Sequence, residues 1–389
     1  MEPLLLAEES SRFPLLADLA YELGLKSAGL ARSVQPPIAE ALAGLVRSMN
    51  CYYSNLIEGH DTHPVDIERA LAGDYSSEPK KRVLQLEAKA HIRVQEWIDA
   101  GGLGEDATSP MAIREIHRRF CSELPDELLW VEEPGPSARV RVTPGELRDR
   151  HVQVGRHVPI SPGALPRFLD RFAAAYSRSS LDRFRTVLNA AAAHHRLLWI
   201  HPFPDGNGRV ARLVTQLTLA RATESRALWS AARGLARNRS EYARLLAECD
   251  LPRRNDLDGR GHLSEESLAD FTAWFLKTCL DQAAFMESLL LPTTLASRIG
   301  LWVAEAARLE GLPLKAGAIL EAALLRGELQ RGDVAGIIGM TDRHARRITS
   351  DLLARGVLSS GGPREPLRLA FPAAVVTRWL PNLYPEPAG

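Results

Sequence analysis

The stretch HPFPDGNGRVAR, residues 201–212, holds a histidine, an aspartate, two glycines around an asparagine, and two arginines. The Gly-Asn-Gly tripeptide at 206–208 leaves backbone N–H groups uncovered where a helix is expected to begin. Free N–H groups and the positive end of a helix bind anions. Arg209 and Arg212 are three residues apart, so they lie on one side of that helix.

The other side chains of this stretch complete a site for phosphate chemistry. Asp205 offers the oxygen ligand that Mg²⁺ prefers when it is shared with phosphates, and both arginines can hold phosphate with paired hydrogen bonds. A neutral His201 can take a proton from an attacking hydroxyl. Each feature alone is common in turns and on solvated helices, but their combination favours phosphoryl or nucleotidyl transfer.

The stretch resembles the signature of the Fic family, HxFx(D/E)GNGRxxR. Every specified position is present, namely His201, Phe203, Asp205, Gly206, Asn207, Gly208, Arg209 and Arg212. Upstream, SNLIEG at 54–59 resembles the family's inhibitory motif, (S/T)xxxE(G/N), and the region around PGELRD at 144–149 resembles its target-binding flap. The resemblance covers most of residues 45–290.

The resemblance implies a protein adenylyltransferase, which moves AMP from ATP to a Ser, Thr or Tyr hydroxyl of a target protein. It leaves self-modification and the identity of the target open. It assigns the general base to His201, the Mg²⁺ ligand to Asp205, the α-phosphate to Asn207 and nearby amides, the β-phosphate to Arg209 and the γ-phosphate to Arg212.

The resemblance also implies that the chain inhibits itself. Ser54 and Glu58 are four residues apart on one face of a helix, and Glu58 would pair with Arg212 in the place of the γ-phosphate. In some relatives this glutamate also supports AMP removal. Tyr242 and Leu246 are candidates for adenine contact, although ordinary helix packing explains them equally well.

The rest of the chain predicts a mainly α protein with a Fic-fold helical core and a β-hairpin flap. Small helices are expected within 1–32, and longer ones at 37–58, 64–72, 79–100, 110–123, 164–178, 181–199 and from Asn207 on, continuing to about 290. Valines and one isoleucine alternate with polar residues within 134–163, which predicts the hairpin. They are Val140, Val142, Val152, Val154, Val158 and Ile160.

The last hundred residues have a different organisation, with a boundary expected at Leu291-Pro292. Three helical segments and a Gly/Pro-tipped ribbon follow, which is the layout of a winged helix-turn-helix. Its third helix, capped by Thr341, would carry Arg343, Arg346 and Arg347 where DNA contacts occur. Docking or dimerisation is an equal alternative. The expected domains are 1–108 with the inhibitory helix at about 37–58, 109–291 with the catalytic core, and 292–389.

The amino-acid composition limits the classes of binding partner and the compartment that we expect. Lys+Arg and Asp+Glu are both 48, so no global positive charge points to nucleic acid. Four scattered cysteines favour a reducing cytoplasm, and no apolar run is long enough to span a membrane. The expected ligands are ATP and Mg²⁺, with DNA and a homodimer left open. The alternatives are a DNA-binding regulator whose Fic site senses nucleotide, a de-AMPylase, and transfer of another nucleotide.

Overall fold

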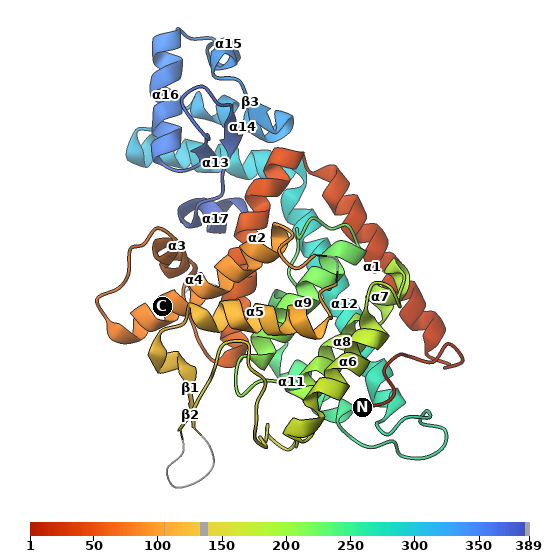
Figure 1. The fold of residues 1–389 in the computed structure, drawn as a ribbon. Coiled ribbons are helices and arrows are strands. Elements are labelled where there is room, and N and C mark those ends of the chain that lie inside the picture. Colours follow the sequence, from red (N-terminus) through yellow and green to blue (C-terminus); the bar gives the residue numbers. More distant parts are fainter. Residues whose placement is uncertain (105, 133–138, 386–389) are drawn as a thin grey trace. The chain divides into compact units, whose positions relative to one another are not determined.

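The computed structural model describes residues 1–104, 106–132 and 139–385. It divides into two compact units. Unit 1 comprises Met1–Ala28 and Asn50–Ala283, and unit 2 comprises Gly29–Met49 and Ala284–Gly389. Three long helices have residues in both units, namely α1 (Phe13–Ser33), α2 (Pro36–Glu58) and α12 (Glu265–Leu290) (Figure 1). No helix within the described ranges is long and apolar enough to cross a membrane.

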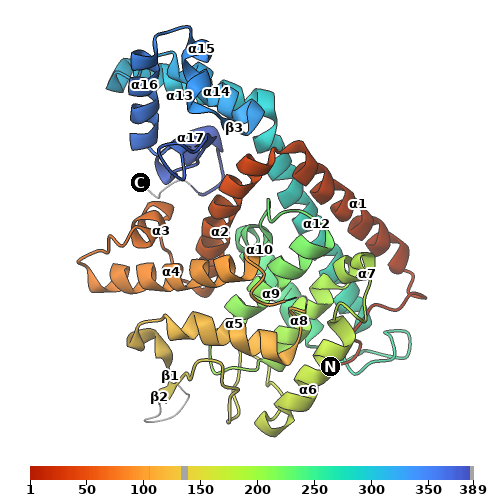
Figure 2. The same cartoon turned by 45° about the horizontal axis from the view of Figure 1, so that its top comes forward.

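Unit 1 is built around α9 (Asn207–Ala222), whose side chains are buried on nearly every side. A helix buried all round belongs to the centre of a core. Figures 1 and 2 show α9 among neighbouring helices. The helices that contact it are α4 (Pro79–Asp99), α5 (Pro110–Ser122), α7 (Arg183–Leu188), α8 (Ala190–Ile200) and α10 (Ala231–Arg237). The remaining helices of unit 1 are α3 (Pro64–Leu71), α6 (Leu165–Tyr176) and α11 (Arg239–Cys249), with short 3₁₀ turns at Asp126–Leu129 and Pro162–Ala164.

Local sequence explains where these helices begin and end. Proline opens α2, α3, α4 and α5, since its missing N–H is not needed in a first turn. The Ser109 hydroxyl caps α5 by accepting from the Ala112 N–H at 3.1 Å. Gly59 ends α2 with φ of 90°, which lets the His60 N–H reach the Asn55 carbonyl at 2.9 Å. The predicted helices at 37–58, 64–72, 79–100 and 110–123 are confirmed.

The helix predicted over 181–199 is interrupted. Asn189 ends α7 and precedes α8 with φ of −97° and ψ of 10°. Its side chain donates to the Arg185 carbonyl at 3.0 Å and accepts from the Leu6 N–H at 3.2 Å. An asparagine that bonds nearby backbone groups competes with the helical ladder, so the single helix becomes two. The small helices expected within 1–32 are likewise wrong, because α1 is one continuous helix.

The predicted hairpin is shorter than expected and begins earlier. Strands β1 (Trp130–Glu132) and β2 (Arg139–Arg141) pair antiparallel, and residues 134–138 lie outside the described ones. Beyond β2, the predicted strands through 152–160 are wrong, since only a single bridge joins Val154 and His157. Arg148 instead donates to the carbonyls of Arg150 at 2.9 Å and Ile160 at 2.5 Å. A guanidinium that satisfies these carbonyls removes the need for a strand ladder.

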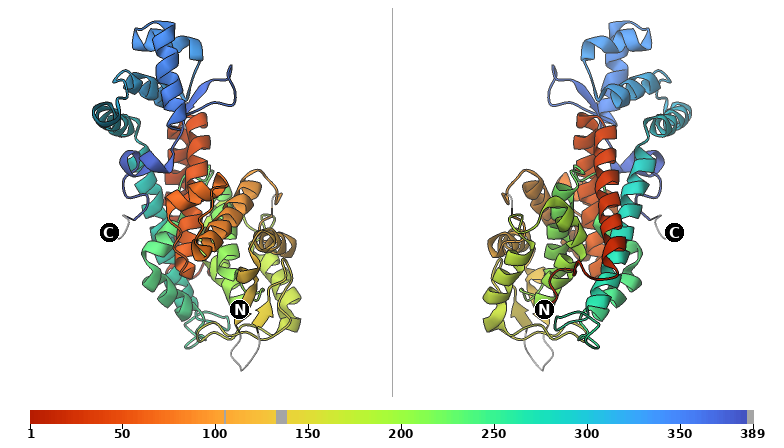
Figure 3. Two further views of the ribbon diagram at one scale, coloured as in Figure 1. Left: turned by 90° about the vertical axis from the view of Figure 1, so that its left-hand side faces the viewer. Right: turned by 90° about the vertical axis from the view of Figure 1, so that its right-hand side faces the viewer.

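Unit 2 contains a three-stranded antiparallel sheet with the order β3-β5-β4 and several helices, seen from two sides in Figure 3. The order helix, helix, helix, ribbon follows the prediction, while the winged-helix identity stays a prediction. Thr341 occupies the predicted N-cap position of α16 (Asp342–Ala354). Its hydroxyl lies 2.9 Å from His344 Nδ1 and makes no capping hydrogen bond to the backbone of the helix. The elements are α13 (Pro292–Glu310), α14 (Ala316–Arg326), β3 (Glu328–Leu329), a 3₁₀ turn (Arg331–Asp333), α15 (Val334–Ile338), α16 (Asp342–Ala354), β4 (Leu358–Ser359), β5 (Leu367–Leu369) and α17 (Ala373–Trp379).

Candidate functional site

The loop between α8 and α9 is fixed by two left-handed residues. His201 ends α8 with φ of 49°, and Gly206 precedes α9 with φ of 80°. A non-glycine residue in this region costs about 1–2 kcal/mol, so His201 is held there by its surroundings. Arg148 supplies part of that support, since its Nε donates to the His201 carbonyl at 2.7 Å and its backbone N–H donates to the Pro202 carbonyl at 2.9 Å.

Phe203 and Asn207 close the loop from inside. The Asn207 side chain accepts from the Phe203 N–H at 2.9 Å and donates to the Phe203 carbonyl at 2.8 Å. The Phe203 ring is fully buried and stacks on the His117 ring, with centroids 3.8 Å apart. Phe203 therefore packs the loop onto the core, and the amide of Asn207 shapes the loop that presents the backbone N–H groups of α9.

Replacing Asn207 by alanine is expected to destabilise unit 1. The change removes two internal hydrogen bonds, each contributing about 0.5–1.5 kcal/mol, so the free energy of unfolding should fall by about 1–3 kcal/mol. Chemical denaturation of wild type and Asn207→Ala measures the difference. Asn238→Ala is a control that removes one asparagine bond, to the Gly234 carbonyl. An Asn207 variant as stable as wild type would contradict this role.

His201 is set up as a neutral base. Burial of the ring, followed by the positive charge of Arg148 and by His157, lowers its pKa to about 4. The imidazole is therefore uncharged near neutral pH and can accept a proton. The role of His201 as general base stays a prediction.

Asp205 presents its carboxylate to solvent at the tip of the loop, with 52% of its side chain exposed. Its backbone carbonyl lies 3.2 Å from His117 Nε2. His117 Nδ1 accepts from the Gly145 N–H at 2.9 Å, so its Nε2 carries the proton and donates to Asp205. Among the described residues no group of three or more His, Cys, Asp or Glu side chains could enclose a metal ion. Asp205 as the Mg²⁺ ligand stays a prediction.

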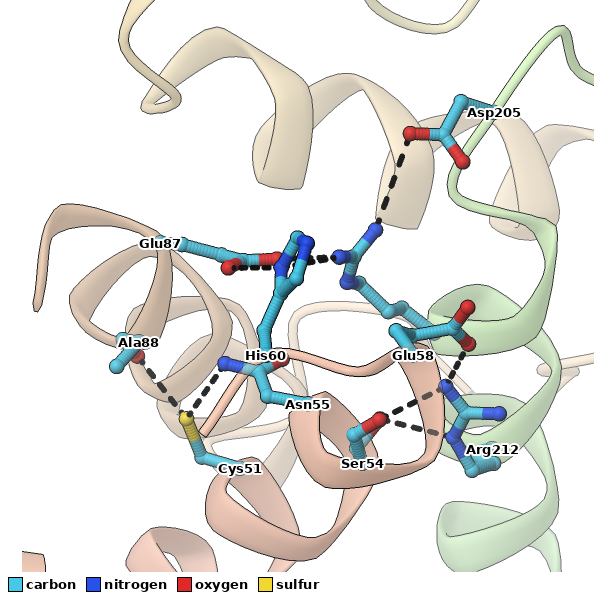
Figure 4. A network of polar contacts seen from close by, with 10 residues as sticks. Cys51, Ser54, Asn55, Glu58, His60, Glu87, Ala88, Asp205 and Arg212 are labelled. Atoms are coloured by element: carbon cyan, nitrogen blue, oxygen red, sulfur yellow. Dashed lines mark hydrogen bonds and ion pairs between the residues drawn. The ribbon is translucent and has the colours of Figure 1, made fainter. Parts of the chain in front are cut away.

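Arg212 is held by the last turn of α2. Its Nε donates to the Ser54 hydroxyl at 2.8 Å, its Nη2 donates to the Ser54 carbonyl at 3.2 Å, and Nη2 also pairs with Glu58 (Figure 4). A Cβ atom on Gly208 would collide with the Glu58 carboxylate. Glu58 therefore lies against the first turn of α9, where an anion would bind.

The charge of Glu58 is maintained by its cationic neighbours. Burial opposes ionisation, but the charges of Arg212 and Arg209 outweigh it and lower the pKa of Glu58. The carboxylate is thus ionised at neutral pH. The structure brings Ser54, Glu58 and Arg212 together as the sequence predicted.

Arg209 has partners that sequence reasoning missed. Its guanidinium pairs with Glu87 of α4, and its Nη1 lies 3.9 Å from Asp205 Oδ2. His60 Nδ1 lies 2.7 Å from Glu87 Oε2 and 3.2 Å from Arg209 Nη2. A signal for Glu87 existed, because it lies four residues after Val83 on the apolar stripe of the predicted helix, where a charge needs a partner.

Tyr242 is tied into the core of unit 1. Its hydroxyl lies 2.7 Å from His194 Nε2, and His194 Nδ1 lies 2.8 Å from the Thr215 hydroxyl. Burial raises the pKa of Tyr242 to about 12, and its ring is nearly parallel to that of Trp274 at 6.3 Å. Leu246 is half-buried. Adenine contact by Tyr242 and Leu246 stays a prediction.

Comparison with known proteins identifies the region around the loop. The Fic/DOC family model matches residues 107–219. Over 110 residues the chain is 44% identical to a protein of Aedes aegypti and 42% identical to one of Drosophila melanogaster, both named Protein adenylyltransferase Fic. Each alignment covers 28% of this chain and 19% of the relative. The match therefore spans about a fifth of the length of these relatives.

A solved structure extends the similarity in fold beyond this segment. The crystal structure of a Fic family protein from Desulfovibrio desulfuricans G20 aligns with a TM-score of 0.53 and 16% identity, covering 92% of this chain and 96% of that one. The predicted mainly α Fic fold is thereby confirmed. The segment that matches the Fic/DOC family model, residues 107–219, includes the HPFPDGNGRVAR loop.

Proposed function

We propose that this protein is an adenylyltransferase that moves AMP from ATP to a Ser, Thr or Tyr hydroxyl of another protein. The observation that carries the proposal is the loop at 201–212. It combines a neutral His201, an exposed Asp205 and the first turn of α9 with two buried arginines. The names of the matched relatives support the same reaction.

The proposed reaction places each group of the loop on one part of the reacting system. The triphosphate lies along the first turn of α9, where backbone N–H groups and the positive helix end favour anions. Arg209 holds the β-phosphate. Arg212 holds the γ-phosphate once Glu58 has moved away. Mg²⁺, held by Asp205, would neutralise charge on the phosphate oxygens when bound.

His201 acts on the target hydroxyl. As the hydroxyl oxygen bonds to the α-phosphorus, its proton passes to the ring nitrogen of His201, and the bond from the α-phosphorus to the bridging oxygen breaks to release pyrophosphate. Negative charge grows on the pyrophosphate. Arginines fixed in position before the reaction stabilise that charge without reorganisation.

The flap would position the target. We propose that the β-hairpin and the extended segment after it add an edge to which a target strand pairs, so that the hydroxyl is aligned for attack. The exposed Val154 and Val158 in this segment, 45% and 65% exposed, support a contact of this kind. The target is to be found by incubating the purified protein, or its Glu58→Gly variant, with α-labelled ATP and Mg²⁺ in a cell lysate and identifying the labelled bands. If neither protein labels any band, the result counts against the proposal.

Replacing Asp205 by alanine is expected to remove Mg²⁺-dependent transfer, by roughly 100-fold or more, because metal stabilisation of phosphate charge contributes several kcal/mol. The measurement is the labelling rate against Mg²⁺ concentration. Asp256→Ala, which changes a 90% exposed aspartate outside the loop, is the control. Mg²⁺ dependence that survives unchanged in Asp205→Ala would place the ion on another carboxylate.

A second candidate function is DNA binding through unit 2, alone or as a regulator whose Fic site senses nucleotide. Arg343, Arg346 and Arg347 are exposed on α16, and none of them forms an ion pair with a described residue. The test compares the full chain with Arg346→Ala/Arg347→Ala for duplex DNA binding over a range of salt. Equal, weak binding by both would exclude this function, whereas phosphate contacts predict a reduced salt slope in the variant.

All four cysteines are free and buried, which supports a reducing cytoplasmic location. The division into 1–108, 109–291 and 292–389, a homodimeric state, and AMP removal or transfer of another nucleotide stay predictions. The lysate experiment also tests the last two reactions. Labelling by a nucleotide other than ATP, or loss of label from a modified target, would replace AMP transfer as the proposed reaction.

A further inference from the structure

The first arginine of the loop, Arg209, is anchored inside the protein by a carboxylate from another helix. Only 6% of the Arg209 side chain and 1% of the Glu87 side chain are exposed. The guanidinium also lies 5.4 Å from the centre of the Phe120 ring. Removing one partner from such a buried pair leaves an uncompensated charge, so Glu87 determines where the Arg209 guanidinium lies.

The second oxygen of Glu87 reaches the end of α2. Glu87 Oε2 lies 2.7 Å from His60 Nδ1, and since a carboxylate only accepts, the Nδ1 proton must lie between them. His60 follows Gly59 directly, and its backbone N–H is bonded to the Asn55 carbonyl at 2.9 Å. The His60 ring is therefore placed by the same turn that ends α2 (Figure 4).

One short segment thus reaches both phosphate-binding arginines. Glu58 contacts Arg212 directly. Two residues later, His60 contacts Glu87, and Glu87 contacts Arg209. A movement of the end of α2 that takes Glu58 away from Arg212 would also move His60, two residues later in the chain, relative to Glu87.

We propose that Glu87 is a positioning residue for Arg209, and that His60, by sharing its carboxylate, ties the end of α2 to that arginine as a second inhibitory contact. This inference rests on the proposed function. Glu87 holds the guanidinium with Nη1 directed toward Asp205, at 3.9 Å from Oδ2. The β-phosphate is expected at this place, so Glu87 prepares the arginine for charge on the leaving group.

The His60 contact depends on pH. Three charged groups face the His60 ring, namely Glu87 of α4, Arg209 of α9 and Glu58 of α2. The hydrogen bond to Glu87 is the largest effect and raises the pKa of His60 above its usual 6.5. The protonated ring therefore stabilises the inhibited state fully below about pH 6.5, and this stabilisation is lost as the pH rises through the raised pKa. Inhibition should relax toward higher pH.

Kinetics in a background without Glu58 test the positioning role. We expect Glu58→Gly/Glu87→Gln to show a kcat for labelling with α-labelled ATP roughly tenfold or more below that of Glu58→Gly, with KM for ATP changed much less. Glu58→Gly/Glu123→Gln is the control. It removes the exposed pair of Glu123 with Arg93 of α4 and should match Glu58→Gly. Equal kcat in all three proteins would overturn the role of Glu87.

A pH series tests the coupling to α2. The ratio of the wild-type rate to the Glu58→Gly rate should rise severalfold from about pH 6 to about pH 8. The ratio of the His60→Gln rate to the Glu58→Gly rate should already be higher at pH 6 and should not change with pH. His201, with a pKa of about 4, is neutral across this range and does not contribute. A flat ratio in the wild-type chain would overturn the coupling.

NMR titration of the His60 ring gives a readout that needs no activity. Its pKa should lie above 6.5 in the wild-type protein and fall in Glu87→Gln. A His60 pKa that is the same in both proteins would overturn the contact. If Glu58→Gly labels nothing at any pH, the proposed function fails, and this titration still decides whether Glu87 and His60 form the bridge.

Discussion

Replacing Glu58 by glycine is expected to raise AMP transfer, including transfer onto the protein itself, by roughly tenfold or more. Glu58 pairs with Arg212 and lies against the first turn of α9. Its removal frees the guanidinium and the anion-binding turn, and each charge-assisted contact contributes about 1–3 kcal/mol. Since about 1.4 kcal/mol is a factor of ten in rate, a gain of this size follows. Glu58 is the last residue of α2, so glycine there weakens the helix little.

The same comparison has an internal control. In Glu58→Gly/Arg212→Ala the freed arginine is absent, so most of the gain should be lost. Ser54→Ala removes one of the other contacts of Arg212 and should raise transfer less than Glu58→Gly does. Equal labelling of wild type and Glu58→Gly would contradict inhibition by α2 and leave the chemistry of the loop standing.

Replacing His201 by alanine, in the Glu58→Gly background, is expected to lower transfer by about 10²–10⁴-fold, the usual loss of a general base. ATP binding should be nearly unchanged, since the imidazole takes the proton of the target hydroxyl and contacts no phosphate. Rates of labelling and equilibrium binding of ATP measure the two effects separately.

His201→Asn is the matched variant, because asparagine tolerates the left-handed conformation of this position better than alanine does. Loss of transfer in both variants assigns the effect to the base rather than to backbone strain. Transfer at the parent rate in either variant would remove His201 from the mechanism.

The sequence predicted those features that depend on residues close together in the chain. Proline at the start and Gly59 at the end predicted α2 within one residue, and the repeat of apolar residues predicted α4. The loop at 201–212 could be interpreted because its functional groups are neighbours in the chain. Ser54 and Glu58 were found by their motif, and the structure brings them to Arg212.

The features that were missed depend on contacts between distant segments. Asn189 interrupts a helix through a bond to Leu6, which is 183 residues away. Arg148 binds carbonyls that were expected to form strands. Glu87 received no role from the sequence, and only the fold shows that Arg209 and His60 pair with it. Sequence periodicity identifies a buried position, but it does not identify the partner of a buried charge.

The most direct test of the central claim uses Glu58→Gly with Mg²⁺ and ATP labelled at either the α- or the γ-phosphate. Transfer of AMP keeps the α-phosphate on the protein and releases the γ-phosphate in pyrophosphate. We therefore predict that α-labelled ATP marks the protein in a His201-dependent manner and that γ-labelled ATP does not. Label from the γ-phosphate on the protein, or no label from either substrate, would contradict the account.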